Sequence, residues 1–174
     1  MAWISKSGPL TDKESLNNAQ ELINWCVANI PNVTENALKA LMGNAKAESG
    51  INPGRHEVGG SGYGIFQWTP MSKLTDWCAE RGLDYTQGES QMARFKYEID
   101  NGLQWFPNNN ANPVTPPFTL LEYMQSTLDV TTLTWYFMWY YEHPNNDPDV
   151  NHIYQRIEWA NNFFNGLDFS GAGG

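Results

Sequence analysis

The chain has 174 residues, a net charge of −9, and Phe, Trp or Tyr at 14% of its positions. This length fits one domain around one hydrophobic core. Ten basic residues against nineteen acidic ones provide no cationic surface, which excludes nucleic acid and anionic membranes as partners. The first twenty residues show no secretory signal peptide, and no stretch is long enough to span a membrane. The aromatic residues exceed what a core of this size needs, so we expect some of them to line a groove.

Helix start and stop signals are frequent in the first hundred residues. A capping box of Thr11 and Glu14 precedes apolar residues at three- and four-residue steps, and Pro31 ends the pattern. Thr34 caps a second predicted helix, which ends at Gly50. Two further helices are predicted over residues 70–82 and 91–101.

The second half of the chain begins with a proline- and asparagine-rich stretch at residues 107–117, which predicts a surface loop. Thr119 and Glu122 form another capping box, and after Asp129 the run TTLTWYFMWYY predicts a central helix buried on most sides. Asp147 and Pro148 mark the start of a last helix. The ending SGAGG predicts a flexible linker, so we assign residues 1–168 to one domain and 169–174 to the start of a linker.

Only residues 55–68 lack helical periodicity. They hold two strand-like pieces, RHEV and YGIFQW, joined by GGSG, and this pattern predicts a small β-hairpin. The expected fold class is therefore α+β, mainly α, with one hairpin directly after the second helix. The two cysteines, Cys26 and Cys78, lie on apolar helix faces, where buried free thiols are expected, although one disulfide between them stays open.

Glu48 is the first candidate for chemistry. It continues the apolar stripe of the second helix, so its side chain should leave the helix on the inward face. Partial burial would raise the pKa of its carboxyl, as a general acid requires. The alternative is a solvated Glu, or one paired with a base such as Arg55. The glycine-rich loop that follows lets backbone approach a ligand, and Tyr63, Phe66 and Trp68 offer stacking faces for a sugar.

The segments AESGINPG and GYGIFQW resemble the active-site signature of the lysozyme superfamily. MGNAKAESGINPG, GYGIFQWTP and YYEHP are similar, more narrowly, to the lysozyme domains of bacteriophage tail proteins, and the resemblance covers most of the chain. It implies a lysozyme-like helical domain with a hairpin after the catalytic helix. It also implies Glu48 as the proton donor and Gln67 as a residue lining the cleft, with Tyr63 and Gly64 beside it.

Position 62 departs from the pattern of animal-type lysozymes, where an aspartate precedes the Tyr-Gly pair. Here it is Gly62, so a retaining mechanism lacks its nucleophile. Glu57, nine residues after Glu48, could act as a base for water; the alternative is an exposed residue beside His56. A third route uses the muramyl 6-hydroxyl as the nucleophile and needs one protein carboxyl.

Glu142 ends the aromatic run, where the helix dipole disfavours a negative charge. Pairing with Arg156 or a backbone donor is the structural interpretation, and the family resemblance adds a role in lining the cleft. The three histidines show no metal-ligand spacing, so neither a metal nor another cofactor is expected.

The resemblance predicts a peptidoglycan hydrolase that cleaves the β-1,4 bond between N-acetylmuramic acid and N-acetylglucosamine, with Glu48 as general acid. It places the protein in the phage tail, acting on the cell wall beside other tail proteins or a following domain. A lytic transglycosylase and a glycan-binding tail module without catalysis are the alternatives. The acidic charge fits a tethered enzyme, since a free one would be repelled by anionic walls.

Overall fold

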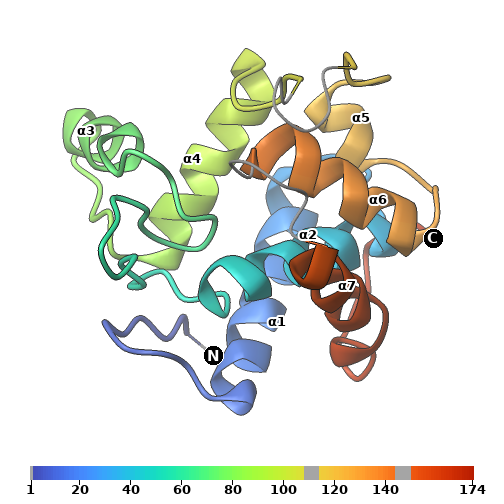
Figure 1. Cartoon of the computed structure of the whole chain (residues 1–174), viewed down its shortest axis with the longest axis horizontal. Coiled ribbons are helices and arrows are strands. Elements are labelled where there is room, and N and C mark those ends of the chain that lie inside the picture. The colour runs from blue at the N-terminus through green and yellow to red at the C-terminus, as the bar shows by residue number, and fades with distance from the viewer. Residues whose placement is uncertain (1, 108–113, 144–149) are drawn as a thin grey trace.

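The computed structural model describes residues 2–107, 114–143 and 150–174, and these residues are mainly helical (Figure 1). The elements in chain order are α1 (Asp12–Asn29), α2 (Glu35–Ser49), α3 (Ser72–Glu80), α4 (Gly88–Asn101), α5 (Leu120–Met124), α6 (Val130–Phe137), η1 (Met138–Glu142), α7 (Val150–Glu158) and η2 (Trp159–Phe163). The two η elements are π-helices. Among the described residues, no helix has the length and apolar content needed to cross a membrane.

The predicted helix signals are confirmed at α1 and α2. Thr11 accepts a hydrogen bond from the backbone N–H of Glu14, whose carboxylate accepts one from the N–H of Thr11. Thr34 caps α2, and Gly50 ends it in the left-handed conformation that glycine adopts without strain. The fourth helix begins at Gly88, three residues earlier than the sequence pattern predicts.

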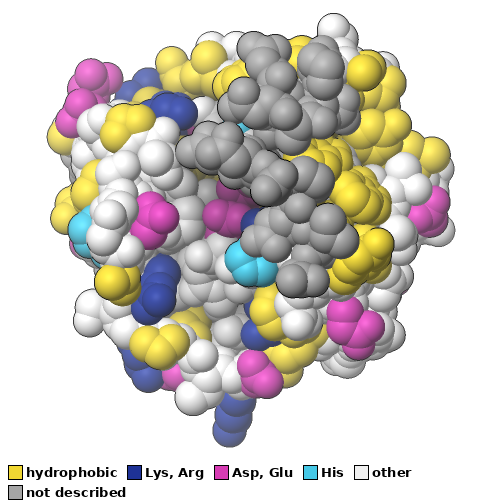
Figure 2. Space-filling view, in the orientation of Figure 1, with side chains coloured by type: hydrophobic (Ala, Val, Ile, Leu, Met, Phe, Trp, Pro, Cys, Tyr) yellow, Lys and Arg dark blue, Asp and Glu magenta, His cyan; other side chains and the backbone are white. Residues whose placement is uncertain are grey.

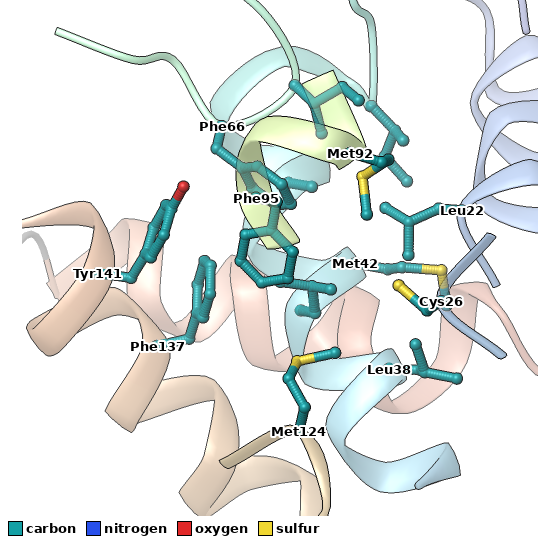
Figure 3. Close-up of a cluster of buried hydrophobic side chains, with 14 of the residues drawn as sticks. Leu22, Cys26, Leu38, Met42, Phe66, Met92, Phe95, Met124, Phe137 and Tyr141 are labelled. Atoms are coloured by element: carbon teal, nitrogen blue, oxygen red, sulfur yellow. The ribbon is translucent and has the colours of Figure 1, made fainter. Parts of the chain in front are cut away.

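Helix α2 forms the centre of the molecule and packs against α6, α7 and η2. Its inner face, with Leu38 and Met42, is fully buried. Figure 3 shows this face meeting side chains from α1, α4 and the aromatic run of α6 and η1. The rings of Phe66, Phe95 and Phe137 lie close together in this core, with centroids 5.0, 5.8 and 6.4 Å apart. The end of α2 is therefore fixed from several sides.

Gly43 allows α7 and η2 to approach α2 closely. A Cβ at this position would lie 2.6 Å from the Ala160 Cβ and 2.6 Å from the backbone oxygen of Arg156. Any larger residue would push these helices apart. The glycine thus brings Arg156 next to the last turns of α2.

The predicted β-hairpin over residues 55–68 is not present. The segment forms isolated bridges, His56 with Tyr63 and Tyr63 with Trp68, in place of paired strands. Gly59, Gly64 and Gln67 have positive φ angles there, and such residues turn the backbone before a ladder can extend. The prediction of a mainly helical fold is confirmed, and the prediction of a hairpin is wrong.

The aromatic run TTLTWYFMWYY forms one continuous helical segment, but its geometry changes from α to π at Met138. A π-turn holds more residues per turn than an α-helix, so the side chains after it point in different directions from those that an α-helical pattern predicts. Residues 108–113 of the predicted 107–117 loop, and the predicted helix start at Asp147 and Pro148, lie outside the described residues.

The last residues lie against the start of α2. The N–H of Gly173 donates to the Val33 carbonyl at 2.8 Å, and the Gly173 carbonyl accepts from the Glu35 N–H at 2.8 Å. The backbone is thus tied down where the composition predicts the start of a linker, while the division into domain and linker stays a prediction.

Cys26 and Cys78 are both buried free thiols, so the alternative of a disulfide is excluded.

Candidate active site

A cavity of about 710 Å³ opens beside the end of α2. Its lining comes from α2, from the loop at residues 57–69, from α3 and the residues after α4, and from η1 and α7. Figure 2 shows acidic, basic and histidine side chains gathered at the middle of the face that this cavity opens on. Segments far apart in the sequence thus contribute polar groups to one concave surface, as ligand sites commonly do.

Glu48 lines this cavity from the last turn of α2, and its side chain is 20% exposed. One of its carboxylate oxygens, Oε2, accepts a short hydrogen bond from Nη2 of Arg156, and the two form an ion pair. The guanidinium also donates from Nη1 to Asn44 Oδ1 at 2.9 Å. The basic partner of Glu48 is therefore Arg156 of α7, rather than the neighbouring Arg55.

Glu142 lies at the end of η1 and lines the same cavity. Arg156, its predicted ion-pair partner, is engaged by Glu48 instead. Oε1 of Glu142 is buried and has no hydrogen-bond partner among the described residues. Burial raises the pKa of Glu142 well above its ordinary value, and the charge of Glu48 raises it further, while Arg156 opposes both. The π-turn directs this carboxyl into the cavity.

Glu57 lines the cavity from the loop, and Gly62 lies next to its carboxylate. Glu57 Oε2 accepts a hydrogen bond from the Gly62 N–H at 3.1 Å. A Cβ at Gly62 would lie 3.1 Å from Glu57 Oε2, 2.9 Å from Gln67 Oε1 and 3.2 Å from Thr69 Oγ1. The carboxylate of Glu57 thus occupies the space in front of position 62, toward which a side chain there would point.

Gln67 also lines the cavity, and its amide is fixed. Its Nε2 donates to the carbonyls of Arg55 and Gly64, each at 3.0 Å. These bonds hold the residue in its positive-φ conformation and leave Oε1 facing the space near Gly62. Gln67 therefore presents a hydrogen-bond acceptor at a defined place beside Glu57.

The aromatic residues of the loop serve the core more than the cleft. Phe66 is 1% exposed and Trp68 is 3% exposed, so only an edge of each reaches the cavity. Tyr63 is buried against His56 and Tyr85, and neither it nor Gly64 is among the lining residues. Phe66 packs on Phe95, Phe137 and Tyr141, so its faces are occupied by the core. Three stacking faces for a sugar remain a prediction.

Buried polar side chains hold the loop in place. The Gln91 side chain accepts from the Ile65 N–H at 2.9 Å and donates to the carbonyls of Pro53 and Tyr85 at 2.7 and 2.8 Å. Ser49, at the end of α2, donates to the Ile65 carbonyl at 2.8 Å. These contacts satisfy loop backbone groups that a β-ladder would otherwise satisfy.

Glu98 lies behind the cavity and is fully buried. It accepts hydrogen bonds from Trp68 Nε1 at 3.0 Å, from Arg94 Nε at 3.3 Å, and from the Tyr141 hydroxyl at short range. Burial raises its pKa to about 7, although the bonds from Tyr141 and Arg94 oppose the shift. The network ties α4 to one residue of the loop and one of η1 that both line the cavity.

A further part of the cavity rim is formed by Lys73, Gln104, Phe106 and His143. Lys73 Nζ donates to Gln104 Oε1 at 2.8 Å, and the His143 ring stacks on Phe106 at 4.0 Å between centroids. Burial lowers the pKa of His143, so its imidazole is neutral near pH 7, and it also lowers the pKa of Lys73. This rim combines one exposed ring with hydrogen-bonding groups, which suits a polar ligand with apolar faces such as a sugar.

Comparison with known proteins identifies the family. The family described as phage tail lysozyme matches residues 17–167, which is most of the chain. The chain belongs to the phage tail lysozyme family. One relative, Morphogenesis protein 1 of Bacillus phage B103, is 34% identical over 149 residues, corresponding to 83% of this chain and 38% of that protein. The suspected family is confirmed, and the chain spans well under half the length of this relative.

In this member of the family, the structure adds Arg156, named from the sequence only as a possible partner of Glu142, and Glu98 to the candidate site residues. Both leave a sequence signal: Arg156 is a charged residue within the apolar stripe of Ile153, Ala160 and Phe164, and it is 6% exposed. Glu98 follows Arg94 by four residues on a buried helix face. A charge on an apolar stripe indicates a buried partner, but the sequence does not say which one.

Proposed function

We propose that this phage tail lysozyme is a muramidase that hydrolyses the β-1,4 bond between N-acetylmuramic acid and N-acetylglucosamine. Family membership implies peptidoglycan as the substrate. The observation that carries the proposal is that Glu48, at the end of α2, and Glu57, in the loop that follows, line one cavity. Most glycoside hydrolases use two carboxyl groups that flank the glycosidic bond to be cleaved.

In this mechanism Glu48 donates a proton to the glycosidic oxygen as the bond to the anomeric carbon breaks. Glu57 accepts a proton from a water that attacks the same carbon from the other face, and Gln67 Oε1 helps to hold that water. The resulting products are a reducing N-acetylmuramic acid end and a free 4-hydroxyl on the departing sugar.

The environment of Gly62 supports Glu57 as the base. A side chain at position 62 would meet the Glu57 carboxylate, so Glu57 supplies a negative charge near the place where animal-type lysozymes carry their aspartate. Gln67 Oε1 and Thr69 Oγ1 border the same space and give a water two further hydrogen-bond partners.

The first test is Glu48→Gln, assayed by loss of turbidity of purified cell walls. Gln keeps the shape of Glu48 and an acceptor for Arg156 but carries no transferable proton, so the rate should fall by roughly 10²- to 10⁴-fold while the protein stays folded. A folded variant with more than about a tenth of the wild-type rate refutes the assignment. Walls that stay turbid with the wild-type protein support the alternative of a glycan-binding module.

The second test is Glu57→Gln combined with mass spectrometry of the products. Hydrolysis gives reducing muramic acid, whereas attack by the muramyl 6-hydroxyl gives the 1,6-anhydro sugar. We expect reducing ends from the wild type and a rate loss of roughly 100-fold in the variant. Anhydro products would show that the enzyme is a transglycosylase that works with one protein carboxyl. A Glu57→Gln variant as fast as the wild type would show that Glu57 is not the base.

We further propose that the enzyme acts from the phage tail, where it opens the host cell wall locally. The family description names the tail, and the relative in phage B103 is named as a morphogenesis protein. The net charge of −9 supports a tethered enzyme, since a tether maintains a high local concentration at the wall without electrostatic attraction. Gold-labelled antibody against this chain should mark the tails of phage particles.

A further inference from the structure

The ion pair of Glu48 leaves the source of its proton unexplained. A general acid must carry a proton when the substrate is bound. Arg156, which is always protonated, lies against the Glu48 carboxylate and stabilises its charged form. If the proposed function is right, something in the cavity must deliver a proton to Glu48.

Three buried side-chain atoms of residues that line this cavity have no hydrogen-bond partner among the described residues. They are Oε1 of Glu142, an acceptor when that carboxyl is ionised, Nε of Arg156, a donor, and Nδ1 of His143. Buried polar atoms are nearly always paired, so each unpaired atom calls for an explanation. Glu142 and Arg156 line the same cavity. Glu142 Oε1 lacks a donor and Arg156 Nε lacks an acceptor, so a second arrangement of the site in which these two atoms pair would satisfy both.

The charges around Glu142 favour its neutral form in the arrangement that the structure shows. Burial raises its pKa, Glu48 on α2 and Glu98 on α4 add to this, and Arg156 on α7 opposes it. The remaining titratable groups of the cavity are Glu57, Lys73, Tyr141, His143 and His152. Glu142 thus favours its protonated form, while the Glu48 carboxylate is paired with Arg156.

We propose that Glu142 is the positioning residue that protonates Glu48: the two carboxyls share one proton, and the Arg156 guanidinium pairs with whichever of them is ionised. In the arrangement seen here, Glu142 holds the proton and Arg156 pairs with Glu48. When the proton moves, one O–H bond breaks on Glu142 and one forms on Glu48, and Arg156 turns its Nε to Glu142 Oε1. The net charge of the three groups remains zero.

The proton balance of a full turnover then closes. Glu48 gives its proton to the glycosidic oxygen, and the two carboxylates with Arg156 carry one net negative charge. The attacking water gives its proton to Glu57, which releases it to solvent, and Glu142 takes one proton back from solvent. One water is consumed for each bond cleaved, with no other reactant.

A role in binding glycan is the alternative for Glu142, and Glu142→Gln separates the two roles. Gln retains the size of Glu and an oxygen acceptor for Arg156 or for a sugar hydroxyl, but it has no proton to transfer. We expect kcat on soluble, uncrosslinked peptidoglycan strands at pH 7 to fall by about 10- to 100-fold, with KM within about twofold. The alkaline midpoint of the kcat profile should move down by at least one pH unit, because the second carboxyl that holds the shared proton is then absent.

Matched variants complete the experiment. Glu142→Asp keeps a proton, so it should restore the wild-type midpoint with a lower kcat. Glu158→Gln changes an exposed glutamate on α7, outside the cavity, and should behave as wild type. A Glu142→Gln variant with a wild-type pH profile, or with a change in KM alone, overturns the proposal. An active Glu48→Gln variant refutes the proposed function itself, so the two failures are distinguishable.

A second measurement keeps the proposal testable if Glu142→Gln does not fold. Carboxyl ¹³C shifts of glutamate are followed against pH in Glu98→Gln, which removes the other buried glutamate whose pKa is raised. In Glu98→Gln, one glutamate should stay protonated above pH 6. The same signal should be present in the double variant Glu98→Gln, Glu158→Gln. If every glutamate in the folded protein ionises below pH 6, Glu142 does not hold the shared proton.

Discussion

The two walls of the cleft are stabilised in different ways. The loop wall, residues 51–69, has its buried backbone groups satisfied by polar side chains such as Gln91 and Ser49. The helical wall, η1 and α7, is packed against the core through rings such as Tyr141, which stacks on Phe137 of α6 at 4.5 Å between centroids. Yet the helical wall carries the unpaired polar atoms of Glu142, His143 and Arg156.

This difference indicates a division of labour. Hydrogen bonds from buried side chains favour one loop conformation, which holds Glu57 and Gln67 in place without a β-sheet. Unpaired atoms on a well-packed helix can change partners without moving the backbone. The loop wall therefore positions groups around the substrate, and the helical wall is where proton exchange between Glu142 and Glu48 is proposed.

The largest loss of stability is expected for Gln91→Leu, which removes the hydrogen bonds that hold the loop wall. Leucine has a similar volume but leaves the Ile65 N–H and the Pro53 and Tyr85 carbonyls without their partner. Each buried unsatisfied group costs about 1–3 kcal/mol, so the free energy of unfolding should fall by about 3–5 kcal/mol in urea denaturation.

Gln87→Leu is the matched control for that variant. Gln87 is exposed at the start of the same helix, and its change should stay within about 0.5 kcal/mol. Equal losses in the two variants would mean that Gln91 does not clamp the loop, and that the comparison of the two walls is wrong.

The loop also shows how far the sequence could predict this structure. Helices were predictable because Thr11, Thr34 and Gly50 are local signals that act within one turn. The hairpin prediction failed because the alternative partner, Gln91, lies 26 residues beyond Ile65, and no local pattern connects them. Long-range polar contacts of this kind override β-propensity.

The candidate site was predictable in the same uneven way. Glu48 follows from its helix stripe together with the family resemblance, and the cavity contains it. The pairing of Glu48 with Arg156 depends on two helices that meet over 108 residues of sequence. The direction of Glu142 depends on a π-turn, which has no simple periodic signature.

The next effect in size concerns Glu98, which joins the two walls through Trp68 and Tyr141. Its folded-state pKa of about 7 lies above the ordinary value of 4.5, so the folded protein binds the proton more tightly than the unfolded chain does. This stability is present below pH 4.5 and is lost as the pH rises through 7.

Urea denaturation of the wild type and of Glu98→Gln across this window checks the prediction. The free energy of unfolding of the wild type, relative to the variant, should fall by about 3 kcal/mol between pH 4 and pH 8. A difference that stays constant or grows with pH would show that Glu98 is ionised in the folded protein, with Arg94 compensating its burial.

The smallest of the three expected stability losses is that of Gly43→Ala, which tests the helical wall. The added methyl would lie 2.6 Å from the Arg156 carbonyl oxygen, so α7 must move away from α2. We expect a loss of about 1–3 kcal/mol in stability. Thr11→Ala, which removes a helix cap outside the cavity lining, should lose about 1 kcal/mol and provides a control for destabilisation alone. If Arg156 must be held at Glu48, Gly43→Ala lowers kcat well below that of Thr11→Ala at a temperature where both are folded. Equal kcat values would mean that the helical wall tolerates displacement and that Arg156 needs no fixed position.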